Sequence, residues 1–317
     1  MPTSNRNPGI PLDLGWAHKS NFVNLSAVER RAATLTKRRS IKKDWQMAWL
    51  LKAVTLTDLT TLSGDDTPGN VQRLCAKARS PVRRDLLEGM GMEPITVAAV
   101  CVYHARVQDA LDALKGTGIP VAAVATGFPA GQSPFQQRLD EIKASVGAGA
   151  REIDVVISRA HVLTGDWETL YDEVRQFRAA CGEATLKTIL ATGELGNLRN
   201  VRMASLVCMM AGADFIKTST GKEKVNATLP YGLVMARAIR DYEEETGHRV
   251  GLKPAGGIRT AKDALAWLTL VKEELGDDWL RADLFRLGAS ALLEDIERQL
   301  SYHLTGRYAA RHHMPMT

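Results

Sequence analysis

The chain has 317 residues, of which 45% are hydrophobic and 24% are charged, and its formal net charge is +5. Both fractions are ordinary for a globular protein, so they exclude a disordered, collagen-like or coiled-coil chain. The length allows two average domains, or one large α/β barrel with an extension. The basic balance raises the question of an anionic partner, which would be nucleic acid, a membrane surface or a phosphorylated substrate.

The positive charge is concentrated at the N-terminus. Residues 1–52 hold ten Lys/Arg and three Asp/Glu, a net charge of +7, whereas the other 265 residues hold 31 and 33, a net charge of −2. The pattern predicts one helix from about Ala27 to Arg39, capped by Ser26, and a second from about Lys42 to Leu51. Residues 1–52 are therefore predicted to form a basic helical extension.

Several signals are absent from the sequence. No apolar run approaches the roughly 18 residues that a membrane span needs, and the first residues lead into no apolar signal-peptide core. The four cysteines are scattered, and neither they nor the seven histidines have the spacing of a metal site. We therefore expect a cytoplasmic protein with free thiols, no membrane partner, no metal and no cofactor.

From residue 53 onwards, short apolar segments alternate with amphipathic helical patterns. Eight segments are predicted to be strands, namely 54–60, 96–103, 121–128, 151–158, 185–192, 214–220, 250–257 and 284–290. Near-continuous apolar strands, each followed by a helix, indicate a parallel sheet that is buried on both faces. Eight such units predict a (β/α)8 or TIM barrel over residues 53–302, with a tail at 303–317. A doubly wound open sheet is the alternative, but no GxGxxG follows the first strand.

Three consecutive predicted strands carry a lysine where a barrel strand should be apolar, at Lys187, Lys217 and Lys253. Two ammonium groups about 7 Å apart at an effective dielectric of about 20 repel each other by roughly 2.4 kcal/mol, which lowers one pKa by about 1.7 units. A lysine that is neutral near pH 7 can attack a carbonyl and form a Schiff base, which allows C–C bond cleavage without a metal.

Three carboxylates belong to other predicted strands, Asp58 to the first and Glu152 and Asp154 to the fourth. At the C-terminal mouth of a barrel, a carboxylate beside a reactive lysine can shuttle protons. The alternative is that lysines and carboxylates form structural ion pairs. Three lysines on neighbouring strands favour catalysis, but charge alone does not say which lysine reacts.

Glycine-containing loops after the seventh and eighth predicted strands indicate phosphate binding. They are Pro254-Ala-Gly-Gly-Ile-Arg259 and Gly288-Ala-Ser290. Glycine lets backbone N–H groups approach an anion closely, and these two loops are the usual phosphate cradle of such barrels. Gly221-Lys222, after the sixth strand, would add a cationic contact.

Over residues 45 to 302 these segments resemble deoxyribose-phosphate aldolase, a family of class I aldolases with a (β/α)8 fold. The resemblance rests on the motifs TDLTTL, VAAVATGFPAG, EIDVV, LKTILATGEL, DFIKTSTGK and KPAGGIR. It implies reversible, metal-independent cleavage of 2-deoxy-D-ribose 5-phosphate to acetaldehyde and D-glyceraldehyde 3-phosphate, a step of deoxyribose phosphate catabolism. The basic extension resembles that of animal-type members.

The resemblance also implies roles for individual residues. Lys217 would form the Schiff base, and Lys253 would perturb its pKa and take part in proton transfer. Asp154 would donate and accept protons, with Lys187 in contact with it. The sugar site would be lined by Asp58, Thr60 and Thr220. The residues that bear on the phosphate would be Gly221, Lys222, Gly256, Gly257, Arg259, Gly288 and Ser290.

Three positions depart from the family pattern. His104 stands where a proline is common, and we expect an exposed histidine in an altered turn. Ser158 stands where many members carry asparagine. Some bacterial members end in a tyrosine that reaches the site, whereas Tyr308 here is expected to anchor the tail by packing.

A second class of function is polyanion or RNA binding by the extension. The basic residues concerned are Arg30, Arg31, Lys37, Arg38, Arg39, Lys42 and Lys43. A solvated helical face packed by Trp45 and Trp49 is favoured instead, because no RNA-binding aromatic motif accompanies the charges. We therefore expect a phosphosugar substrate and no nucleic acid. Nuclear targeting by Lys37–Lys43 is a weaker alternative, and a homo-oligomer is compatible with the sequence.

Overall fold

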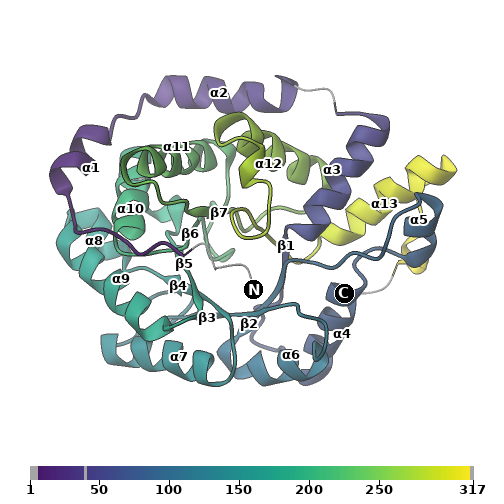
Figure 1. Ribbon diagram of the computed structural model, residues 1–317, viewed down its shortest axis with the longest axis horizontal. Helices are drawn as coiled ribbons and strands as arrows, with labels where there is room; N and C mark the ends of the chain where they lie inside the picture. The colour runs from purple at the N-terminus through teal and green to yellow at the C-terminus, as the bar shows by residue number, and fades with distance from the viewer. Residues whose placement is uncertain (1–5, 39–40, 315–317) are drawn as a thin grey trace.

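The computed structural model describes residues 6–38 and 41–314, so Arg39 at the end of the first predicted helix lies outside the described residues. Eight parallel strands form one sheet in the order β7-β6-β5-β4-β3-β2-β1-β8. Two isolated bridges, Leu252 to Phe285 and Ala255 to Gly288, bring the last strand beside β7 and close the barrel. Helices surround the sheet (Figure 1), which confirms the predicted (β/α)8 barrel.

The strands are short, and each lies within a predicted segment. They are β1 Thr57–Thr60, β2 Ala99–Tyr103, β3 Val121–Ala125, β4 Glu152–Val156, β5 Thr185–Ile189, β6 Phe215–Lys217, β7 Gly251–Lys253 and β8 Leu287–Ala289. The register places Asp154 beside Lys187 on β5, and Lys217 beside Lys253 on β7. Since paired residues of a parallel sheet point to the same face, charged side chains from neighbouring strands meet inside the barrel.

The barrel helices follow the predicted amphipathic segments. They are α4 Pro68–Arg79, α5 Arg84–Gly89, α6 Val107–Ala113, α7 Phe135–Gly147, α8 Arg159–Thr164, α9 Trp167–Cys181, α10 Leu198–Met210, α11 Leu229–Thr246, α12 Ala261–Glu274 and α13 Leu292–Thr305. A capping box starts α12, because the Thr260 hydroxyl accepts the N–H of Asp263 and the Asp263 carboxylate accepts the N–H of Thr260. This box fixes the end of the glycine loop that follows β7.

The extension contains three helices, α1 Leu14–Ser20, α2 Leu25–Arg38 and α3 Lys43–Thr55. The predicted cap at Ser26 is wrong, because Ser26 lies within α2 and the side chain of Asn24 accepts the N–H of Ala27. Helix α1 was not predicted, because its seven residues are too few to show a helical pattern of apolar residues. Helix α3 continues past the predicted end at Leu51 into the first predicted strand segment.

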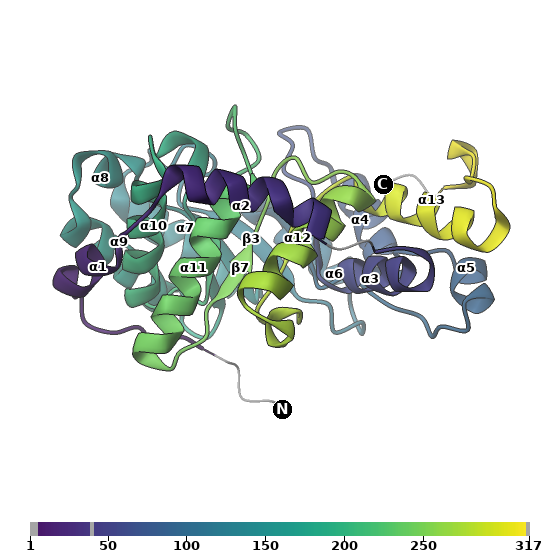
Figure 2. The same ribbon diagram turned by 90° about the horizontal axis from the view of Figure 1, so that it is seen from above.

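The extension packs along the outside of the barrel. Helix α1 contacts α10, α2 contacts α11 and α12, and α3 contacts α12 and α13. Figure 1 and Figure 2 both show α2 running over α11 and α12. Val28, Ala32 and Leu35 of α2 are at most 4% exposed, so its apolar face is buried. The division at residue 52 stays a prediction.

The two tryptophans of α3 differ in burial. Trp49 is half-buried and packs against the core, as predicted. The predicted packing of Trp45 is wrong, because its side chain is 75% exposed. Trp45 lies in the first turn of α3, where it lines an open groove beside Leu280 instead of contacting the core.

The segment before α1 is fixed by Asn7, which is 2% exposed. Its backbone N–H donates to Asp214 at 3.0 Å, and its side-chain amide donates to the carbonyl oxygens of Met209 and Ala213. The Asn7 side-chain oxygen accepts the hydroxyl of Tyr242 at 3.0 Å. The N-terminal segment is thereby attached to the residues that directly precede β6.

The cysteines are free, as predicted from their scattered spacing, and all four are buried. Burial raises the pKa of Cys75 to about 11 and the pKa values of Cys181 and Cys208 to about 12, so these thiols stay protonated at neutral pH. In the part of the chain that the structure describes, no helix is both long and apolar enough to cross a membrane.

Candidate active site

A cavity of about 310 Å³ opens where β1, β6, β7 and β8 end. These strands are neighbours in the closed barrel, so the loops that follow them converge on one point. The predicted residues that line it are Thr60, Lys217, Thr220, Gly221, Lys222, Gly256, Gly257, Arg259, Gly288 and Ser290. The other four predicted residues, Asp58, Asp154, Lys187 and Lys253, do not line this cavity and lie buried within the barrel.

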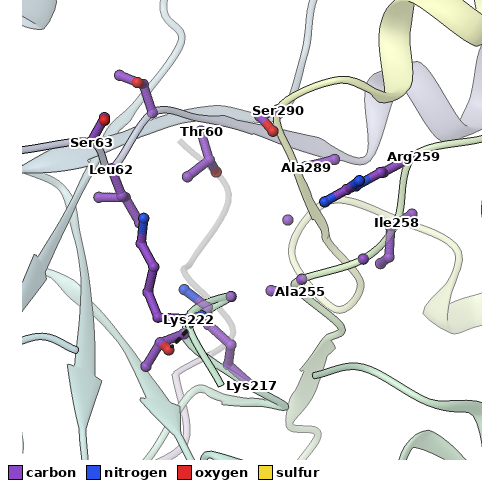
Figure 3. Close-up of a pocket in the computed structure, with 16 residues that line it drawn as sticks. Thr60, Leu62, Ser63, Lys217, Lys222, Ala255, Ile258, Arg259, Ala289 and Ser290 are labelled. Carbon is purple, nitrogen blue, oxygen red and sulfur yellow. Dashed lines mark hydrogen bonds between the residues drawn. The ribbon is translucent and has the colours of Figure 1, made fainter. Parts of the chain in front are cut away.

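Lys217 is the strand lysine that lines the cavity. Its side chain is 3% exposed, and its amine donates to Asp154 Oδ2 at 2.7 Å. Figure 3 shows Lys217 beside Lys222, with Arg259 and Ser290 across the cavity. Lys217 is the last residue of β6, so the strand end places its amine where the barrel opens to a ligand.

Asp154 joins the three lysines. Its Oδ2 atom accepts Lys217 and Lys253, each at 2.7 Å, and its Oδ1 atom accepts Lys187 at 3.0 Å. The side chain of Asp154 is fully buried, and burial alone would raise its pKa. The three ammonium groups outweigh burial and hold the pKa of Asp154 well below its ordinary value, so the carboxylate is ionised.

Arg286, directly before β8, is a charged residue that the sequence analysis missed. Its guanidinium donates to Asp58 Oδ1 at 2.5 Å and to Glu152 Oε1 at 2.8 Å, and the side chain is 7% exposed. The signal was present in the segment LFRLGAS, where a cation interrupts an apolar strand just as the three lysines do.

Six buried side chains of alternating charge form a closed ring beneath the cavity, which we call the charged ring. In order, its members are Arg286, Asp58, Lys253, Asp154, Lys187 and Glu152. Lys253 joins Asp58 Oδ2 at 2.5 Å, and Lys187 joins Glu152 Oε2 at 2.5 Å. The structural ion pairs considered as the alternative to catalysis are therefore present, and Lys217 adds to the ring from the cavity side.

The pKa values of the three lysines differ in direction. Burial lowers the pKa of Lys217, and nearby Lys253 lowers it further, so the shift prevails over the attraction of Asp154. Burial would also lower the pKa of Lys187 and of Lys253, but their carboxylate neighbours raise both above the ordinary value. Burial, which adds to the repulsion between lysines, is thus the larger cause of the lowered pKa of Lys217.

The cavity wall opposite Lys222 combines cationic and backbone donors. Arg259 and Ser290 are exposed there, as is Lys222 on its own side of the cavity. Gly256 and Gly257 both have a φ of +84°, and a Cβ atom at Gly256 would lie 2.7 Å from Asn226 Cβ. Glycine is therefore required at 256 by both conformation and space. The arrangement suits an anion with hydrogen-bond acceptors.

A Cβ atom at Gly288 would lie 2.8 Å from the Cβ of Ala255 and 3.4 Å from Cε of Lys253. Glycine at this position thus makes room for the closure of the barrel and for the lysine below. Gly288 is predicted to bear on the phosphate, and the close approach of Ala255 is a second reason for glycine at this position.

The three departures from the family pattern lie away from the cavity. His104 is exposed in a short 3-10 turn, as predicted. Ser158 is hydrogen-bonded to the Glu173 carboxylate through its N–H and its hydroxyl. Tyr308 stacks on Tyr302 with ring centroids 4.6 Å apart, which fits the predicted packing of the tail.

Within the ranges 6–38 and 41–314, no group of three or more His, Cys, Asp or Glu side chains has the arrangement of a metal site. The groups that the cavity presents are an amine with a lowered pKa, an ionised carboxylate beside it, and a cationic wall. An amine of this kind can form a Schiff base with a carbonyl.

Comparisons with known proteins point to one family. A family model described as DeoC/LacD family aldolase matches residues 52–296. The curated deoxyribose-phosphate aldolase of Mus musculus is 67% identical over 313 residues, which cover 98% of each chain. The deoxyribose-phosphate aldolase of Homo sapiens is 65% identical over 318 residues, covering 99% of this chain and 100% of the relative.

A solved structure has the same fold. The chain of a deoxyribose-phosphate aldolase candidate from Toxoplasma gondii matches with a TM-score of 0.70 and 21% identity. The match covers 84% of this chain and 98% of that one. At this identity the likeness concerns the architecture of the barrel.

Proposed function

The chain belongs to the DeoC/LacD family of aldolases, and from this premise we propose that it is a class I deoxyribose-phosphate aldolase. It cleaves 2-deoxy-D-ribose 5-phosphate reversibly to acetaldehyde and D-glyceraldehyde 3-phosphate without a metal. The observation that carries the proposal is the amine of Lys217, which lines the cavity, has a lowered pKa and touches an ionised carboxylate.

Lys217 acts as the nucleophile. Its neutral amine attacks C1 of the open-chain aldehyde, and loss of water gives a protonated Schiff base. When the C3 hydroxyl loses its proton, the C2–C3 bond breaks and its electron pair moves into the Schiff base as an enamine. Protonation of the enamine at C2 and addition of water then release acetaldehyde and free the lysine.

Asp154 moves protons in these steps. Its Oδ2 atom lies 2.7 Å from the amine of Lys217, and its lowered pKa makes it an acceptor at neutral pH. Lys253 donates to the same oxygen and remains charged, so it favours the return of a proton to the substrate. Lys187 holds the other carboxylate oxygen in place at 3.0 Å.

The substrate's phosphate occupies the cationic side of the cavity. Lys222 and Arg259 supply positive charge, and the glycine loops after β7 and β8 supply backbone N–H groups. Thr60 and Thr220 line the part of the cavity that would face the sugar hydroxyls. Asp58 lies beneath the cavity and acts on the sugar site through its ion pair with Lys253.

The remaining expectations concern partners and location. Buried, free thiols are typical of a reducing compartment, which supports a cytoplasmic location. Arg31 of the extension pairs with Glu273 and Glu274, so this cation already has acidic partners within the chain. We therefore keep a phosphosugar, and not a nucleic acid, as the proposed partner.

Borohydride trapping tests the proposal. Reduction of the protein in the presence of 2-deoxy-D-ribose 5-phosphate should leave a covalent adduct, which peptide mass spectrometry locates on Lys217. Lys217→Ala should lose the adduct and the activity in a coupled assay for glyceraldehyde 3-phosphate. Removal of the nucleophile typically costs several orders of magnitude in rate.

Lys224→Ala is the matched control, because Lys224 is an exposed lysine of the loop that follows β6 and does not line the cavity. It should keep both adduct and activity. A fully active Lys217→Ala variant, or strong inhibition by a chelator, would contradict the proposal.

A further inference from the structure

The charged ring described above is closed by a residue to which the proposed function gives no role. Arg286 touches neither the cavity nor Lys217, yet it connects the two carboxylates at the far end of the ring. We propose, on the basis of the proposed function, that Arg286 is a positioning residue. By closing a charge-balanced ring it leaves Lys217 as the one surplus cation and so keeps the Lys217 amine unprotonated.

Two routes of contact join Arg286 to Lys217. One runs through Asp58 and Lys253 to Asp154, and the other runs through Glu152 and Lys187 to Asp154. Each contact along these routes is at most 3.0 Å, and each side chain is at most 7% exposed. Water therefore screens the ring only weakly, and its charges act on each other strongly.

The charges of the ring cancel. It contains three cations and three carboxylates in alternation, and every member contacts its two neighbours. A proton on Lys217 adds a fourth cation to a buried and otherwise neutral assembly. Burial penalises such an excess charge, and this agrees with the lowered pKa of Lys217 beside two lysines whose pKa values are raised.

Other groups near Lys217 lie outside the ring. Lys222 and Arg259 line the same cavity from loops beyond the strand ends, and both are exposed, so solvent screens their charges. On β2, Cys101 is fully buried, and burial raises the pKa of its thiol, so it stays neutral. Strand β3 is the apolar sequence VAAVA and contributes no titratable group. The charged strand residues that act on Lys217 directly are Asp154 of β4 and Lys253 of β7. The other ring members on strands are Asp58 of β1, Glu152 of β4 and Lys187 of β5, and they lie behind these two.

Arginine suits the closing position for geometric reasons. Its planar guanidinium donates from Nη1 to Asp58 and from Nη2 to Glu152, which belong to different strands. The Phe215 ring lies 5.8 Å from the guanidinium carbon, and the Ala282 carbonyl accepts its Nε–H. A guanidinium also stays charged at any pH at which the enzyme works, so the balance does not vary with pH.

Substitutions that change the balance in opposite directions test the proposal. Arg286→Met leaves the ring with one excess negative charge, so Lys217 should hold its proton more tightly. In the pH profile of the rate of Schiff-base formation, the acidic limb should move to higher pH by about one to two units. Glu152→Gln leaves one excess positive charge, so the same limb should move down.

The double variant Arg286→Met/Glu152→Gln removes one charge of each sign and should return the limb towards its original position. The measurement is the initial rate of borohydride-trapped adduct on Lys217 as a function of pH, with acetaldehyde as the carbonyl probe. A merely structural role for Arg286 predicts a similar loss in every variant and no opposed shifts. Shifts in the same direction, or unchanged limbs, would overturn the proposal.

Arg286→Lys keeps the charge and serves where Arg286→Met does not fold, as judged by thermal unfolding. It should keep the wild-type limb even if its unfolding temperature falls, and a limb displaced upwards would count against charge balance. The proposed function has its own readout. If wild-type protein forms no adduct on Lys217, the aldolase assignment fails, whereas an adduct with unshifted limbs rejects only the role of Arg286.

Discussion

At the scale of single residues, the site has two layers, one that contacts the ligand and one that sets the proton affinity of Lys217. The cavity layer holds the Lys217 amine and the groups that suit an anion, whereas the charged ring beneath it holds the carboxylates and the other lysines. Because the ring is sealed from solvent, its charges can set the proton affinity of Lys217 without competing for the ligand.

Arg259 should govern the preference for a phosphorylated substrate. A charge-assisted hydrogen bond to phosphate is worth about 1.5–3 kcal/mol, so Arg259→Ala should raise the KM for 2-deoxy-D-ribose 5-phosphate by roughly 10- to 100-fold. The cleavage of unphosphorylated 2-deoxyribose should hardly change, because that substrate lacks the anion. Steady-state kinetics with both sugars measures the difference.

Lys262→Ala provides the control for this change, since Lys262 is an exposed cation near the start of α12, the helix that follows the Arg259 loop, and does not line the cavity. An equal loss with both sugars in Arg259→Ala would show that Arg259 supports the loop and does not bind the phosphate.

The lysines and the glycine loops of the cavity were predictable because they break a local rule, whereas Thr60 and Thr220 were expected only from the family resemblance. A lysine in an apolar strand, or paired glycines after one, stands out within a few residues of sequence. The ring as a whole did not stand out, because its contacts span long separations. Arg286 meets Glu152 across 134 residues and Asp58 across 228 residues. No local pattern encodes which carboxylate will face which cation.

At the scale of elements, strand β6 depends on a residue near the start of the chain. Asp214, which directly precedes β6, accepts the backbone N–H of Asn7 and of Leu186 and pairs with Arg178 at 2.7 Å. Lys217 is only three positions after Asp214, so whatever fixes Asp214 also fixes the strand that carries the amine.

Asn7→Ala should therefore destabilise the fold. It leaves the buried carbonyl group of Ala213 and the Tyr242 hydroxyl without a partner, and it removes one of the two donors to the Met209 carbonyl. Unsatisfied buried polar groups cost about 1–3 kcal/mol each, so the free energy of unfolding should fall by roughly 2–4 kcal/mol. Urea denaturation followed by circular dichroism measures the change.

Asn24→Ala makes a useful comparison, because it removes an exposed helix cap whose loss costs about 1 kcal/mol. If Asn7→Ala cost no more than Asn24→Ala, the attachment of the N-terminal segment to β6 would be energetically unimportant.

Element boundaries were less predictable than element types. The β-branched Val54 and Thr55 favour a strand locally, yet they continue α3, because this helix packs against α12 and α13. Several predicted strands also extended into the glycine loops, where backbone pairing stops and the cavity begins. In both cases tertiary packing, which a short sequence window does not contain, decided the boundary.

At the scale of the whole molecule, the basic extension is a covering layer of the barrel. Its apolar side contacts α11 and α12, and its charges face outwards or pair with acidic residues such as Glu274. The net charge of +7 in residues 1–52 therefore says little about the cavity, which has its own small set of cations.

Deleting residues 1–38 should expose the apolar surface that Val28, Ala32 and Leu35 cover. An exposed apolar patch promotes association, so the shortened protein should aggregate and unfold at a lower temperature than the full chain. Size-exclusion chromatography and thermal unfolding measure both effects. Reversing the charge of Arg30, which is exposed, should leave stability unchanged. A soluble, fully stable deletion variant would show that the barrel is independent of the extension.

The bond between Asn7 and Asp214 has a consequence for the order in which the protein can be completed. The two residues are 207 positions apart, so when Asn7 leaves the ribosome none of its partners has yet been synthesised. The segment around Asn7 therefore lacks these partners while β1 to β5 are synthesised. It can bind them only once the residues next to β6 have emerged. The segment that contains Asn7 is thus fixed late, at about the same stage as Lys217 on β6.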